Sequence, residues 1–187
     1  MKRSEVNGIM ARATEIFLRH GWALPPEPKW DITDFGWGEF RKSGLVLVNL
    51  AEEEEYCEKL MLAEQNQHIP AHTHGKKKED IISRFGTLAI QMWNNRALSE
   101  EGTCKLRKNG VDMEVPSGHI EFVPTGERVT LVPGVFHAFW PIGEYTVIGE
   151  VSTKNDDVDD NVFSRDDVGR FPTIEEDVPA LRPLISE

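Results

Sequence analysis

The chain has 187 residues, of which 39% are apolar and 28% charged, and its formal net charge is −11. This length suits one domain with a sizeable core, and this balance excludes disorder as the main state. Such an acidic surface repels nucleic acid and anionic membranes, so we expect neither as a partner. The charge is compatible with binding a neutral small molecule or a metal cation.

The cysteines and the first residues indicate where the protein works. Cys57 and Cys104 lie far apart and do not resemble a disulfide framework. Residues 1–6 carry charges and lead into an amphipathic segment, without the apolar core of a signal peptide. No later apolar run is long enough to cross a bilayer. We therefore expect a reduced, cytoplasmic protein.

The first predicted element is a helix over residues 4–20. Ser4 is its expected N-cap, and Gly21 its stop. One face carries apolar residues at the spacing of a helix: Val6, Ile9, Met10, Ala13, Ile16 and Phe17. The proline-rich segment 24–28 cannot continue the helix and should be extended.

From residue 44 onward, short runs of β-forming residues alternate with turn residues. The runs cover 44–50, 59–62, 87–93, 104–106, 120–123, 128–132, 137–140 and 145–151. Asn109-Gly110 is a strong hairpin signal, because both residues tolerate positive φ. Pro116-Ser117-Gly118, Pro124-Thr125-Gly126 and Pro133-Gly134 are further turn candidates. This pattern predicts an all-β sandwich or barrel that carries a helical appendage.

The expected organisation is a single domain over residues 1–187. The barrel covers about 44–152, and residues 153–187 form a C-terminal extension. The acidic run 52–55 is expected to be a solvated loop or the start of a helix. Asp156, Asp157, Asp159 and Asp160 lack the spacing of a calcium loop.

The pair His72-Thr73-His74 is the strongest chemical signal. Side chains at i and i+2 of a strand point to the same face, so His72 and His74 would project together toward one ion. The chain can turn past Gly75 and bring Glu79 to that ion, and His137 could supply a third imidazole. These groups suit a first-row divalent ion, although histidines are more often satisfied polar groups than ligands.

Two stretches around these residues resemble the cupin motifs. The run His72-x-His74-x4-Glu79-x6-Gly86 is similar to the first motif, and Pro133-Gly134-x-x-His137 to the second. Asn66 stands where the first motif has a leading glycine, and Pro141 where the second often ends in asparagine. These departures concern loop geometry more than metal ligation. The resemblance implies a cupin fold, the double-stranded β-helix or jelly-roll barrel, here with an N-terminal helix.

A narrower resemblance covers most of the chain. His72-Thr73-His74 with Lys77 and Glu79, then 135–140, Gly149–Asp157 and Gly169–Pro172, together resemble the bacterial D-lyxose isomerases. This resemblance implies a sugar isomerase that interconverts D-lyxose and D-xylulose, with D-mannose and D-fructose as a further candidate pair. It also implies Mn²⁺ as the cofactor, held by His72, His74, Glu79 and His137, and a homodimer.

Aldose–ketose isomerisation by an enediol route needs an acid and a base, for which we name Lys77 and Glu150. Lys77 lies two residues before a ligand, and a nearby dication would favour its neutral form. Glu150 interrupts an apolar strand on the face of Ile148 and Thr146, so it should point inward. The other readings are a solvated turn at Lys76–Lys78 and a salt bridge at the barrel rim for Glu150. A hydride shift is the alternative route, which needs the metal more than the base.

Five further residues are candidates for binding the sugar. Trp93, Phe139 and Trp140 could line the pocket, because aromatic faces pack against the C–H surfaces of sugars, but core packing suits each equally well. Within the resemblance, Asp156 and Arg165 are candidates for closing the pocket on hydroxyl groups.

Three other classes of protein remain open. An Fe(II) cupin dioxygenase would use the same kinds of ligand. A non-enzymatic sugar-binding or sensor cupin would hold a structural ion with closed coordination. A phosphosugar isomerase would need a cationic cluster for phosphate, and Lys76–Lys78 is the one candidate.

Overall fold

The computed structural model describes residues 1–156, 159–169 and 171–187. Its helices are α1 (Arg3–Arg19) and α2 (Phe40–Ser43). The strands are β1 (Lys29–Thr33), β2 (Leu45–Glu52), β3 (Tyr56–Glu64), β4 (His72–His74), β5 (Glu79–Trp93), β6 (Thr103–Lys108), β7 (Val111–Pro116), β8 (Ile120–Pro124), β9 (Arg128–Leu131), β10 (Phe136–Thr153) and β11 (Asn161–Phe163). Within the described residues, no helix is long and apolar enough to span a membrane.

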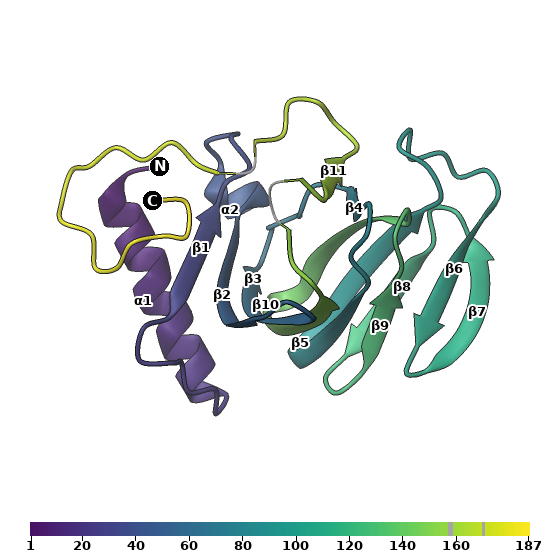
Figure 1. The fold of residues 1–187 in the computed structure, drawn as a ribbon, viewed down its shortest axis with the longest axis horizontal. Helices are drawn as coiled ribbons and strands as arrows, with labels where there is room; N and C mark the ends of the chain where they lie inside the picture. Colours follow the sequence, from purple (N-terminus) through teal and green to yellow (C-terminus); the bar gives the residue numbers. More distant parts are fainter. Residues whose placement is uncertain (157–158, 170) are drawn as a thin grey trace.

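The described strands join in one 11-stranded sheet, in the order β1-β2-β3-β10-β5-β9-β6-β7. All pairings between them are antiparallel. β8 pairs with β5, and β4 lies between β10 and β11. In Figure 1, α1 stands at one end of the molecule beside β1, and the β6–β7 hairpin stands at the other. The predicted all-β architecture with an N-terminal helix is confirmed.

β10 is the longest strand and joins two segments that the sequence had separated. Its register against β5 shifts between Ile142 and Val147, and Gly143 there has a φ of +100°. Such a bulge bends a strand and changes which residues face inward. Accordingly, Phe139 before the bulge and Ile148 after it both belong to the inner core. In a regular strand they would face opposite sides, because their positions differ by an odd number.

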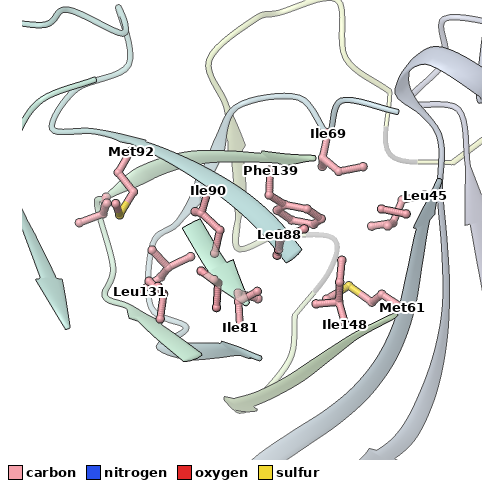
Figure 2. Close-up of a cluster of buried hydrophobic side chains, with 14 of the residues drawn as sticks. Leu45, Met61, Ile69, Ile81, Leu88, Ile90, Met92, Leu131, Phe139 and Ile148 are labelled. Carbon is pink, nitrogen blue, oxygen red and sulfur yellow. The ribbon is translucent and has the colours of Figure 1, made fainter. Parts of the chain in front are cut away.

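Two apolar clusters lie on opposite sides of the sheet. The inner one gathers side chains from β2, β3, β5, β9 and β10, which converge in Figure 2. The outer one packs the predicted apolar face of α1 against Trp30, Val48 and Leu60. Consecutive strand residues alternate between the clusters, as Val147 and Ile148 do. Burying each such side chain contributes about 1.5–3 kcal/mol, which fixes the register of the strands.

The start of α1 differs from the prediction. Its N-cap is Lys2, without a capping side chain, and Ser4 lies inside the helix. The amide and the hydroxyl of Ser4 donate hydrogen bonds to the Asp177 carboxylate, at 2.9 and 2.7 Å. A carboxylate distant in sequence therefore accepts the hydrogen bond of an amide in the first turn. A rule that considers only neighbouring residues cannot predict this contact. The helix ends as expected, with Gly21 at a φ of +81°.

The Asn109-Gly110 hairpin is confirmed. Lys108 pairs with Val111 across the turn, and the two turn residues have φ values of +50° and +85°. The acidic run 52–55 is exposed or half-buried and lies where β2 ends and β3 begins, as a solvated loop. The pattern missed β1, β7, β11 and α2, because these elements are short or largely polar on one face.

Gly8 and Gly110 provide a matched test of this backbone. Gly8→Ala, inside α1, should raise the free energy of unfolding by about 0.5–1 kcal/mol, because helical glycine costs that much relative to alanine. Gly110→Ala should lower it by about 1–2 kcal/mol, because its φ of +85° crowds a Cβ against the backbone. Neither added Cβ meets another atom within 4 Å. Urea unfolding measures both changes. If both variants changed the free energy of unfolding in the same direction, the result would contradict the hairpin geometry.

Candidate metal centre and active site

Three strands bring the predicted ligands together. His72 and His74 are the ends of β4, Glu79 begins β5, and His137 lies near the start of β10. His137 pairs directly with His72 across the β10–β4 ladder. Antiparallel neighbours place their side chains on the same face, so this register brings imidazoles from two strands to one place.

The three imidazoles are close enough to share one ion. One ring nitrogen of each of His72, His74 and His137 lies within 4.8 Å of those of the other two. The Glu79 carboxylate joins them, with oxygens 3.3 Å from Nε2 of His74 and 3.2 Å from Nε2 of His137. Two backbone carbonyls orient the rings: Pro70 O lies 2.9 Å from Nδ1 of His72, and Val135 O lies 3.2 Å from Nδ1 of His137. Because a carbonyl only accepts, Nδ1 carries the proton and Nε2 keeps its lone pair.

The polar atoms of this cluster fit a metal ion. Oε1 of Glu79 and Nε2 of His137 are buried 3.2 Å apart, yet neither has a hydrogen-bond partner. Buried polar atoms are normally satisfied, and a cation between them would satisfy both. Burial lowers the pKa of His72 well below its ordinary value, and His137 and His74 lower it further, which keeps the ring neutral and able to ligate. Burial alone would raise the pKa of Glu79, but Lys77 and His74 hold it well below its usual range.

Lys77 lies beside this cluster and is only 5% exposed, whereas Lys76 and Lys78 are exposed. Its Nζ is 2.8 Å from Oε2 of Glu79 and 2.9 Å from Oε1 of Glu150. Burial alone would lower the pKa of Lys77, but the two carboxylates outweigh it and raise that pKa. This direction is opposite to the one expected from a nearby dication, and it keeps the amine protonated.

Glu150 faces inward, as its alternation in the strand predicted. It pairs with Lys59 on β3, and Nζ of Lys59 lies 3.9 Å from its Oε1. Lys59 also donates to Oδ1 of Asn155, at 2.9 Å. His137 and Glu150 are an odd number of residues apart on β10, and the bulge between them lets both face the same interior.

These groups line one cavity of about 60 Å³. Its wall comprises Thr33, Phe35, Leu45, Leu47, Lys59, Met61, Ile69, His72, His74, Lys77, Glu79, Ile81, His137, Phe139, Glu150, Asn161 and Phe163. Such a volume holds several water molecules or part of a small ligand. The wall combines apolar side chains with a few ionisable groups, as is usual for small-molecule sites.

Only Phe139 of the five expected sugar-binding residues lines this cavity. Trp140 follows it in the strand, points to the opposite face and stacks on His68 with ring centroids 4.1 Å apart. Trp93 packs with Phe136 and Ala138 in a separate cluster.

The other two candidates belong to surface segments. Asp156 accepts a hydrogen bond from the amide of Asp159 at 2.9 Å. Arg165 binds Asp167 and lies over the ring of Trp37. Two residues of the quoted motifs, Asp157 and Arg170, fall outside the described residues.

Sequence reasoning missed three polar residues in or beside the site. Lys59 lies on the same inner face of β3 as Cys57 and Met61, at the spacing of two residues that a strand requires. This spacing could have predicted its inward position. Asn161 and Asp160 lie in and next to β11, which pairs with β4 from far along the chain. No local pattern identifies that pairing.

Solved structures of similar fold are L-ribose isomerases. The enzyme of Cellulomonas parahominis, solved with L-ribose, superposes with a TM-score of 0.72 at 14% identity, over 94% of this chain and 98% of that one. The enzyme of Acinetobacter sp. DL28, also with L-ribose, gives 0.73 at 16% identity over the same shares. At this identity the likeness concerns the fold, and it confirms the cupin barrel.

The sequence comparisons identify the family. A family model described as D-lyxose isomerase matches residues 27–187. A D-lyxose/D-mannose isomerase of Escherichia coli O157:H7 is 30% identical over 100% of this chain and 98% of its own length. One of Serratia proteamaculans is 32% identical over 96% and 94%. The chain therefore belongs to the D-lyxose isomerase family of sugar isomerases.

Proposed function

We propose that the protein is a metal-dependent aldose–ketose isomerase that interconverts D-lyxose and D-xylulose, with D-mannose and D-fructose as a second pair. The observation that carries this proposal is the buried Lys77 ammonium, held between Glu79 and Glu150 beside three imidazoles. An acid, a base and a set of metal ligands thus share one cavity. The names of the sequence relatives agree with these substrates.

His72, His74, Glu79 and His137 would hold the ion, for which we propose Mn²⁺. A bound divalent ion would supply Lewis-acid polarisation of the adjacent oxygens at C1 and C2 of the open-chain sugar.

The protein supplies the proton transfers. Oε1 of Glu150 takes the proton from C2 of the aldose and returns it to C1, which gives the ketose. The ammonium of Lys77 donates its proton to O1 as negative charge develops there, and the resulting amine takes the proton of the C2 hydroxyl as the ketone forms, which restores the ammonium. Without the metal ion, Glu150 and Glu79 raise the pKa of Lys77, and this direction suits the donor role.

The cationic side chains of the cavity are already paired with carboxylates, which favours a sugar that carries no phosphate. Lys59 and Lys77 balance Glu79 and Glu150, so an added dication leaves a net positive site that stabilises an enediolate. No arginine is among the described residues that line the cavity, and both of its lysines lie within 4 Å of a carboxylate. A phosphate would therefore lack a free cationic partner, which argues against a phosphosugar.

We further infer a single domain over residues 1–187. The segment after β10 returns to both the barrel and the N-terminal helix: β11 pairs with β4, and Glu176 and Glu187 bind Arg3 at the start of α1. We also propose a homodimer, which the family resemblance implies, and a cytoplasmic location, which the sequence pattern led us to expect.

Metal binding should be visible without any substrate. With Mn²⁺ at about 100 times its dissociation constant, the chelator-treated protein should gain about 2.7 kcal/mol, which raises its melting temperature by about 5–10 °C. His74→Ala should remove this shift, because it deletes one ligand. His119→Ala is the control, since His119 pairs with Glu121 outside the cavity. An equal shift in both variants would place the ion elsewhere.

Turnover should depend on the metal and on Glu150. We expect the Mn²⁺-loaded protein to interconvert D-lyxose and D-xylulose, and Glu150→Gln to lower kcat by about 10²–10⁴-fold, because it removes the base. Glu55→Gln, in the exposed acidic loop, should leave kcat unchanged. Coupled detection of the ketose measures both. Oxygen consumption without ketose formation would support the dioxygenase, and turnover of phosphosugars alone would contradict an uncharged substrate.

A further inference from the structure

The strand that carries two of the proposed ligands is held chiefly by a segment from far along the chain. β4 meets β10 at one residue pair, His72 with His137. Its other edge pairs with β11 along its whole length, from His74 opposite Asn161 to His72 opposite Phe163. β11 thus fixes the edge of the site, and the residue immediately before it is Asp160.

Asp160 contacts the turn between β4 and β5 through three hydrogen bonds. Its carboxylate accepts from the backbone amides of Lys76 and Lys77, at 2.7 and 2.9 Å. Its carbonyl accepts from the amide of Gly75 at 3.2 Å. The side chain is 5% exposed, and a Cβ added to Gly75 would lie only 3.1 Å from Oδ1 of Asp160. The carboxylate is therefore fitted closely against this turn.

Thr153 on β10 also holds this turn, through two hydrogen bonds with Lys78. The turn lies outside the ladders of β4 and β5, so its amides need acceptors from elsewhere. The amide of Lys78 donates a hydrogen bond to Oγ1 of Thr153 at 3.1 Å. Asp160 serves Lys76 and Lys77, and hydrogen bonds to an ionised carboxylate are roughly twice as strong as neutral ones.

We propose that Asp160 is a positioning residue for Lys77. By fixing the backbone amide of Lys77, it sets where that side chain starts and so where Nζ lies between Glu79 and Glu150. This inference rests on the proposed function, in which Lys77 is the proton donor. It also gives one member of the acidic run 156–160 a role that is not metal binding.

Two variants grade the interaction. Asp160→Ala removes both acceptors, and Asp160→Asn keeps the shape and one acceptor. Asp159→Asn is the matched control, because Asp159 is exposed and its contact with Asp156 uses its backbone amide. We expect kcat on D-lyxose to fall by about 10²-fold in Asp160→Ala, because a displacement of about 1 Å can cost that much. The kcat of Asp160→Asn should lie between those of Asp160→Ala and the Asp159→Asn control. KM and Mn²⁺ content should stay close to wild type in all three variants.

A double-mutant cycle separates positioning from general stability. In a Lys77→Gln background, Asp160→Ala should cause no further loss of kcat, because its effect passes through Lys77. Amide hydrogen exchange of the metal-free protein gives a readout without turnover. Exchange at Lys76 and Lys77 should accelerate in Asp160→Ala and stay unchanged in Asp159→Asn.

The contrary outcomes are distinct. Losses that multiply in the double variant, or Mn²⁺ content that falls together with kcat, would overturn the positioning role in favour of a structural one. Unchanged kcat in Asp160→Ala would overturn it while the proposed function stands. A wild-type protein that turns over no sugar would overturn the proposed function and the positioning role with it, and exchange at Lys76 and Lys77 would show whether the anchoring contact exists.

Discussion

The buried ammonium of Lys77 is the constraint on which the rest of the site depends. A lone charge at this depth would cost several kcal/mol, on the order of a large part of a domain's stability. Glu79 and Glu150 offset that cost from two different strands. Because Glu79 also belongs to the proposed ligand set, the ion pairs join the proposed acid, the proposed base and the proposed metal site into one unit. Folding of the barrel assembles all three together.

The charge of the molecule is distributed to match this chemistry. The surface carries most of the net charge of −11, whereas the cavity has two lysines against two glutamates. An acidic surface attracts a dication from solution, and an uncharged sugar meets no repulsion on its approach. The apolar side chains of the cavity wall lower the local dielectric, which strengthens each polar contact with a sugar bound there.

The sequence predicted those features that depend on local periodicity. Alternation placed His72 with His74 and turned Glu150 inward, and the glycine-containing turns separated the strands. It could not choose among the aromatic residues, because the inner face of a strand is known only once its bulges are known. Asp177 at the start of α1 and Asp160 beneath Lys77 act from segments distant in sequence. Their hydrogen bonds follow from tertiary packing, which one strand or helix pattern does not encode.

The bulge in β10 has a consequence for how this barrel can change over evolutionary time. His137 and Glu150 face the same interior only because β10 is irregular between them, where its register against β5 shifts twice between Ile142 and Ile148. An insertion or deletion of one residue there would turn one of the two groups outward, whereas a change of two residues would preserve both. We expect related barrels to conserve the parity of this segment's length more strictly than its sequence. The length of this segment, odd or even, and not a particular sequence, would then keep His137 and Glu150 on the same face.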